Sequence, residues 1–163
     1  MKPGDRRRGH VSLSPMNKQE KAMMESLKAN SPLLTALQET GNGKYSRYDC
    51  YVPFDAERGY SIFVELKHRG NTTHYEDTMI EKVKYKALME LPGLAIYSVY
   101  SCGNLYVFNL SQLTKEGYDF NWEDKYCNKT TAFTGHAGNG KKVSKIVGGI
   151  DWSKATRVIE VSL

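Results

Sequence analysis

The chain has 163 residues, of which 40% are hydrophobic and 11% aromatic, a composition typical of one globular domain with its own core. A formal net charge of +5 favours polyanionic partners without establishing them. The three cysteines lie too far apart for a disulfide framework or a zinc knuckle, and neither a membrane span nor the apolar segment of a signal peptide is present, so we expect a cytoplasmic protein without a membrane partner.

The N-terminal part predicts a flexible arm followed by two helices. Residues 1–13 include three consecutive arginines and indicate a flexible basic arm, which leaves 14–163 as a single domain. Ser14-Pro15 predicts a helix start, because serine caps a helix and proline suits its first position. This helix carries two acids, Glu20 and Glu25. Ser31-Pro32 repeats the signal for a short helix over 32–39.

The middle of the chain predicts two strand pairs with a helix between them. Residues 44–54 and 60–69 are rich in strand formers and are separated by "DAERG", which favours a hairpin. Residues 71–91 predict a helix with an apolar stripe that runs from Met79 to Leu88 and ends before Pro92-Gly93. Residues 94–101 and 105–110 predict a second hairpin.

The C-terminal part has weaker signals. A short helix is expected from Ser111, and from about residue 117 the glycine- and lysine-rich sequence indicates a long, partly irregular segment. Residues 156–163, "TRVIEVSL", predict a closing strand. The order of these elements predicts an α/β fold in which helices flank a small mixed β-sheet.

The first predicted hairpin separates apolar from polar residues when it is centred on Glu57. In that register one face holds apolar pairs: Phe54–Tyr60, Val52–Ile62, Cys50–Val64 and Tyr48–Leu66. Most of the opposite face is polar and holds these pairs: Tyr51–Phe63, Asp49–Glu65, Arg47–Lys67 and Tyr45–Arg69. A slip of one residue would mix the two sets, so the pattern itself favours this register.

The polar face predicts a metal site. Asp49 directly opposite Glu65 is destabilising unless a divalent cation lies between the carboxylates, and Mg²⁺, for which Mn²⁺ is expected to substitute, needs only one or two carboxylates plus water and substrate phosphate. Lys67 shares the face and could assist the attacking water or neutralise charge on the phosphate. Glu20 or Glu25 of the first helix could complete the site.

Two alternatives stay open for these residues. Asp55 competes with Asp49 for the aspartate position, although the register places Asp55 in the turn. The whole polar face could instead be ordinary solvent-exposed surface, in which Arg47 and Lys67 pair with the two acids.

Asp49 followed by "VELK", with Glu65 and Lys67, resembles the motif of the PD-(D/E)xK nuclease superfamily. The resemblance covers roughly residues 14–110 and also includes the acidic helix before the hairpin and the helix after it. It implies a restriction-endonuclease-like core and Mg²⁺-dependent hydrolysis of a DNA phosphodiester bond. Asp49 and Glu65 would bind the metal, and Lys67 would assist the attacking water. Tyr48 stands where the pattern often has proline.

Several basic residues are candidates for contact with nucleic acid. Glu81 and Tyr85, four apart, resemble the Q-x-x-x-Y element of RecB-like nucleases with Glu in place of Gln. The candidates for phosphate contact, with a solvated surface as the alternative, are Arg47, Arg69, Lys82, Lys84, Tyr85, Lys141, Lys142 and Lys145. "GHAGNGKK" nearly matches a P-loop but has Lys142 in place of Ser or Thr, so we expect no nucleotide cofactor.

The sequence therefore supports a metal-dependent DNA endonuclease, which could act as a homodimer on junctions, branched DNA or DNA in general. A nucleic-acid-binding module of the same fold without activity is the first alternative. A protein-interaction or inhibitor domain is the second, but it leaves the opposed acids Asp49 and Glu65 unexplained.

Overall fold

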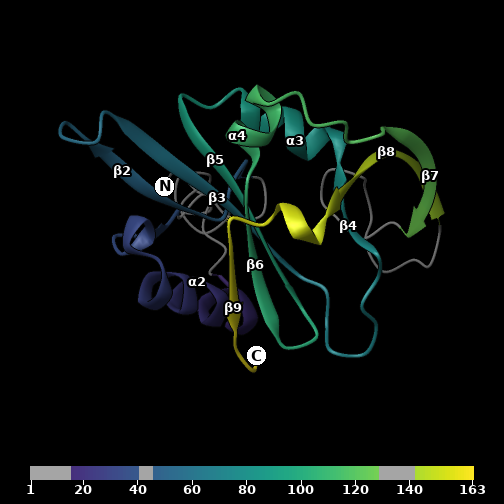
Figure 1. Ribbon diagram of the computed structural model, residues 1–163, viewed down its shortest axis with the longest axis horizontal. Coiled ribbons are helices and arrows are strands. Elements are labelled where there is room, and N and C mark those ends of the chain that lie inside the picture. Colours follow the sequence, from purple (N-terminus) through teal and green to yellow (C-terminus); the bar gives the residue numbers. More distant parts are fainter. Residues whose placement is uncertain (1–15, 41–45, 129–141) are drawn as a thin grey trace, which may run out of the picture.

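The structure, a computed structural model, describes residues 16–40, 46–128 and 142–163, with the backbone alone for 127, 128 and 142. The described residues form an α/β fold with one six-stranded mixed sheet and one three-stranded antiparallel sheet (Figure 1). No helix in these ranges combines the length and the apolar character that a membrane crossing requires. The predicted basic arm, residues 1–13, lies outside the described residues.

The first helix, α2 (Lys18–Asn30), begins with a capping box. The side chain of Asn17 accepts a hydrogen bond from the backbone N–H of Glu20 at 2.8 Å, and the Glu20 carboxylate accepts in turn from the Asn17 N–H. The start signal at Ser14-Pro15 lies outside the described residues. The second predicted helix is reduced to a single 3₁₀ turn, η1 (Pro32–Leu34), because the chain then extends into the two-residue strand β1 (Gln38–Glu39).

The large sheet contains both predicted hairpins and the predicted closing strand. Its strand order is β1-β2-β3-β5-β6-β9. The strands after β1 are β2 (Cys50–Asp55), β3 (Tyr60–His68), β5 (Gly93–Ser101), β6 (Asn104–Asn109) and β9 (Arg157–Glu160). Only β3 and β5 pair in parallel, so the sheet is mixed as predicted.

The predicted register of the first hairpin is confirmed at its centre. Cys50 lies opposite Val64, and Val52 lies opposite Ile62. The pairing then shifts by one residue, so that Asp55 rather than the predicted Phe54 lies opposite Tyr60. Pro53 lies at this shift, and because proline has no N–H to donate to the ladder, an irregularity is expected there.

The connection from β3 to β5 and the C-terminal segment build a second sheet that the sequence did not predict. The expected helix over 71–91 is wrong in its first half, which forms strand β4 (Asp77–Glu81) before α3 (Lys82–Met89) begins. The segment expected to be irregular contains β7 (Glu123–Asn128) and β8 (Lys142–Asp151), which complete the sheet in the order β4-β8-β7. Figure 1 shows this sheet extending to one side of the large one.

Two hydrophobic cores cover the two faces of the large sheet. On one face α2 contributes Met23 and Leu27, which pack with Val64 and other inward residues of β2 and β3. On the other face lie α3 and the expected short helix, α4 (Leu110–Lys115), which contribute Leu88 and Leu110. A 3₁₀ turn, η4 (Trp152–Lys154), joins β8 to β9. The helices thus flank the sheet on both sides (Figure 1).

The start of β5 leaves no room for a side chain beside β3. Gly93 is paired with Ser61, and a Cβ built on Gly93 would lie 2.3 Å from the backbone oxygen of Ser61. Because that neighbour is backbone, the strands would have to separate. We expect Gly93→Ala to destabilise the fold by about 2–3 kcal/mol, measured as a lower urea midpoint. An unfolding free energy unchanged from wild type would contradict this packing.

Candidate functional site

The candidate site lies where α2 meets the start of the first hairpin, and three acids come together there. Asp49 directly precedes β2, and its carboxylate accepts a hydrogen bond from the backbone N–H of Leu66 at 2.7 Å. Glu65 points from the middle of β3, and Glu20 comes from the first turn of α2. The negative charge of Asp49 raises the pKa values of both glutamates, so the structure brings together the three residues that the sequence selected.

Burial dominates the electrostatics of this cluster. Loss of solvation raises the pKa of Glu65 to about 8, the charge of Asp49 adds to the rise, and Lys84 opposes it. Burial also raises the pKa of Asp49, against the hydrogen bond from Leu66 and the charge of Lys84. The pKa of Glu20 is raised first by burial and then by Asp49. Without a cation, the cluster therefore holds protons more tightly than free carboxyls do.

Among the described residues, one oxygen of Glu65 has no hydrogen-bond donor. The Nζ of Lys84 lies 3.1 Å from Oε1 of Glu65, whereas Oε2 is buried and accepts no hydrogen bond. Glu65 also lies within hydrogen-bonding reach of the Asp49 carboxyl, so the two acids can share either a proton or a cation. In the described part of the chain, no group of three or more His, Cys, Asp or Glu side chains is arranged to hold a metal ion as it stands. Two carboxylates, Asp49 and Glu65, nevertheless fit the one or two that Mg²⁺ requires.

Lys67 lies on the same side of β3 as Glu65, two residues along the strand. Burial lowers the pKa of Lys67, and the Arg69 cation lowers it further, whereas Glu81 and Glu65 raise it. Among the residues that the structure describes, Lys67 makes no ion pair. A lysine in this setting loses its proton more readily than a solvated one, which suits a proton acceptor.

The candidate acids that the sequence left open lie in different places. Asp55 lies at the other end of the hairpin, where its carboxylate accepts from the Glu57 N–H at 2.9 Å and stabilises the turn. Glu25 lies at the surface, 3.7 Å from Lys28. Asp49 and Glu20 are therefore the members of each pair that lie at the acidic cluster.

The basic residues of the hairpin and α3 that were predicted to contact phosphate lie in different environments. Arg47 is exposed and lies 3.7 Å from Glu90. Arg69 instead holds β4 against the large sheet by donating to the Met79 carbonyl at 2.5 Å. Lys82 lies over the ring of Trp122, 5.5 Å from its centroid.

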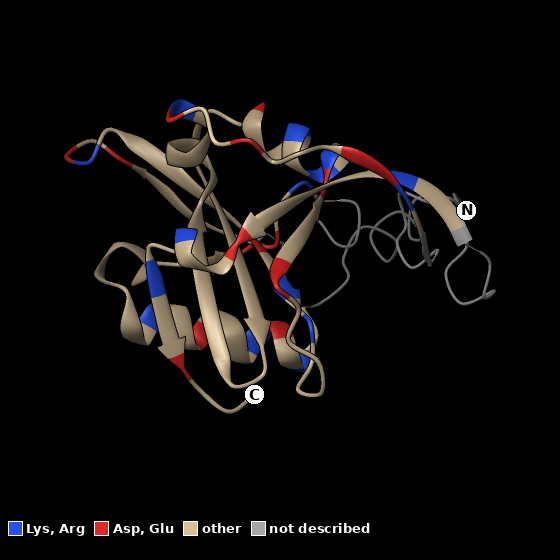
Figure 2. Ribbon diagram, turned by 45° about the vertical axis from the view of Figure 1, so that its right-hand side comes forward, with Lys and Arg blue, Asp and Glu red and all other residues tan. Residues whose placement is uncertain are grey.

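The remaining predicted contacts are spread between α3 and the second sheet. Tyr85 hydrogen-bonds through its hydroxyl to Thr114 at 2.7 Å, and Glu81 is the N-cap residue of α3 rather than part of a shared helix face. Lys145, expected in an irregular loop, is buried in β8 and pairs with Glu81 at 2.9 Å. Lys141 and the side chain of Lys142 lie outside the described residues. Acidic and basic residues are interspersed over the ribbon rather than separated into two faces (Figure 2).

Two neighbours of the site have roles that the sequence did not predict. Lys84 was expected to contact phosphate, but it holds Glu65. Glu39 of β1 lies close enough to raise the pKa of Glu20, and it accepts from the Met16 N–H at 3.3 Å. Neither role has a local signal, because each depends on a pairing between distant segments.

No protein-family model, no curated protein and no solved structure matches the chain. The assignment of the site therefore rests on its geometry and on the motif alone.

Proposed function

We propose that the chain is a metal-dependent hydrolase of DNA phosphodiester bonds, acting as an endonuclease with a restriction-endonuclease-like core. Apart from strand β4, which comes between β3 and α3, the order of α2, the β2–β3 hairpin, α3 and β5 is that of the PD-(D/E)xK superfamily. Glu65 and Lys67 of its motif lie on β3, and Asp49 directly precedes β2. Cleavage of DNA, the role of Mg²⁺ and its replacement by Mn²⁺ are all part of this proposal.

The observation that carries the proposal is the close pairing of the Glu65 and Asp49 carboxyls, with Oε2 of Glu65 buried and no hydrogen-bond donor at it. Two carboxyls this close cannot both be ionised without a free-energy cost, so they must share a proton or hold a cation between them. Lys84 satisfies only Oε1, and the nearby Asp49 carboxylate makes the site more negative. Such a combination suits a hard divalent cation better than any plain structural role.

Each residue then has a distinct task. The Leu66 N–H fixes the Asp49 carboxylate, and Lys84 fixes Glu65, so both acids are held in place before substrate arrives. Mg²⁺, when bound, supplies positive charge that stabilises the charge developing on the phosphate. Lys67, with its lowered pKa, can take the proton of the attacking water or, when charged, stabilise the transition state.

The test uses supercoiled plasmid and a four-way DNA junction with Mg²⁺, with Mn²⁺ and with EDTA. We expect wild type to cut with either metal and not with EDTA. Lys67→Met and Asp49→Asn should each lower the rate by about 10³-fold, since they remove a proton acceptor and a metal ligand.

Matched controls are Lys154→Met, an exposed lysine on η4, and Asp55→Asn, an acid at the far end of the hairpin. Both controls should cut like wild type. If the protein binds DNA but does not cut it, the nucleic-acid-binding module is the better hypothesis. If the protein neither binds nor cuts DNA, the protein-interaction domain is favoured. Binding without cutting and the absence of both activities each contradict the proposal.

A further inference from the structure

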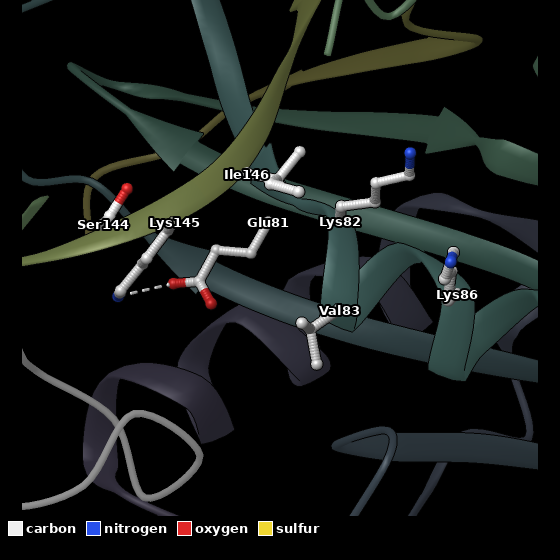
Figure 3. Close-up of a pocket in the computed structure, with 7 residues that line it drawn as sticks. All are labelled: Glu81, Lys82, Val83, Lys86, Ser144, Lys145 and Ile146. Atoms are coloured by element: carbon white, nitrogen blue, oxygen red, sulfur yellow. Dashed lines mark hydrogen bonds and ion pairs between the residues drawn. The ribbon is translucent and has the colours of Figure 1, made fainter. Parts of the chain in front are cut away.

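A pocket of about 350 Å³ lies between α3 and β8 (Figure 3). Its volume falls within the range of small-molecule sites. It is open to solvent, and its lining does not include the acidic cluster of Glu20, Asp49 and Glu65. The residues that line it are Glu81, Lys82, Val83, Lys86, Ser144, Lys145 and Ile146.

The charge of the pocket favours an anion. Lys145 is neutralised by Glu81 at 2.9 Å, which leaves Lys82 and Lys86 as its uncompensated cations. In Figure 3 these two lysines project from α3 on one side, away from the Lys145–Glu81 pair. Within the described residues Lys86 makes no ion pair. A phosphate group matches two adjacent lysines.

The pocket also has apolar walls. Val83 on α3 and Ile146 on β8 are 65% and 46% exposed, respectively, although both are aliphatic. They come from different elements, and both line the pocket. Ser144 offers a hydroxyl at the edge. Cations beside exposed aliphatic side chains suit a ligand with a phosphate and a ring.

The pocket adjoins the acidic cluster. Lys84, one residue from Val83 on α3, contacts Glu65. Residues that line the pocket and the lysine that contacts Glu65 therefore lie on the same helix, α3.

We propose that the pocket receives one unpaired nucleotide of the strand being cut, with its base against Val83 and Ile146 and its phosphate at Lys82 and Lys86. This proposal rests on the proposed function, because it assigns the pocket to the same substrate. A base held in a duplex cannot enter without unpairing, which costs free energy. The enzyme should therefore prefer DNA with an unpaired flap next to the cut over continuous duplex.

The experiment compares cleavage of a flapped duplex with that of a continuous duplex of the same sequence. Wild type should cut the flapped DNA about tenfold faster, the factor expected when one base gains apolar contact. Val83→Ser and Lys86→Ala should lose that preference while still cutting continuous duplex. Val158→Ser, at a valine on β9 that is 53% exposed, and Lys154→Ala should keep it.

A binding assay tests the pocket independently of cleavage. With Ca²⁺ in place of Mg²⁺, fluorescence anisotropy should show tighter binding of flapped DNA, weakened about tenfold by Val83→Ser. Free thymidine 5′-monophosphate should compete poorly, since it lacks the rest of the strand, and equal competition would assign the pocket to free nucleotides instead.

The two proposals fail in different ways. Equal cleavage and equal binding of both DNAs, or a preference that survives Val83→Ser and Lys86→Ala, would overturn the pocket assignment and leave the nuclease intact. If wild type does not cleave DNA but binds the flap in a way that depends on Val83, the nuclease proposal is overturned and the pocket proposal is kept.

Discussion

Replacing Glu65 by glutamine is expected to abolish DNA cleavage and, at the same time, to make the protein more stable. The substitution keeps the shape of the side chain and its contact with Lys84 but removes its negative charge. Cleavage should fall by about 10³-fold or more, because a neutral amide is a poor ligand for Mg²⁺. Stability should rise because the Glu65 carboxylate is buried beside Asp49.

The sign of the stability change follows from the pKa of Glu65, which folding raises from an ordinary 4.5 to about 8. Below pH 4.5 both the folded and the unfolded chain hold the proton, and the glutamate costs nothing. As the pH rises to about 8, the unfolded chain loses the proton while the folded chain keeps it, so folding becomes less favourable. Above pH 8 Glu65 is ionised in both states, and the full destabilising effect of its buried charge on folding is present. The gain from Glu65→Gln should therefore be absent at pH 4 and largest above pH 8.

Thermal unfolding in EDTA at pH 4, 6 and 8.5 measures this gain. Each pKa unit corresponds to about 1.4 kcal/mol, so even part of the shift should raise the Tm at pH 8.5 by about 5 °C or more. Glu57→Gln, a change at an exposed acid of the hairpin turn, should leave the Tm unaltered at every pH. If Glu65→Gln instead lowers the Tm at pH 8.5, the carboxylate is stabilising and the interpretation of the site is wrong.

The core of the hairpin was predictable because its alternation is local. Val52, Ile62 and Val64 must share one face to be buried, and only one register achieves this. That register also placed Asp49 near Glu65. The predicted register fails at Pro53, where the missing N–H shifts the strand pairing and leaves Phe54 exposed.

The second sheet was not predictable from local pattern. Met79, Ile80 and Val83 have helical spacing, but Thr78 and Ile80 are buried with the two-residue period of a strand. What selects the strand is pairing with β8, more than 60 residues later, where Ile80 lies opposite Gly148. Propensity yields to such tertiary pairing.

The same long-range pairing determines which lysine contacts Glu65. Because β4 takes residues 77–81, α3 starts only at Lys82, which changes the face that each lysine presents. Lys84 then meets Glu65, while Lys82 and Lys86 border the pocket. The acids were thus identified from the motif, but the basic residues around them depended on a strand that the sequence did not reveal.

Divalent-metal binding is expected to depend strongly on pH. At pH 7 Glu65 is mostly protonated, since burial and Asp49 raise its pKa to about 8. A cation can use the carboxylate only after the proton leaves, so binding releases a proton. The apparent affinity for Mg²⁺ should rise by up to about tenfold per pH unit from pH 6 to 8 and become constant above about pH 8, where Glu65 is already ionised.

Isothermal titration calorimetry with Mn²⁺ as the probe, in two buffers of different ionisation enthalpy, measures both the affinity and the protons released. Close to one proton per ion is expected at pH 6.5 and almost none at pH 9.5. Lys84→Met removes the cation that lowers the pKa of Glu65, so its affinity curve should shift to higher pH, whereas Lys154→Met should reproduce wild type. An affinity that does not change between pH 6 and 8 is incompatible with Glu65 as a ligand, because a buried, protonated carboxyl cannot bind a cation without giving up its proton.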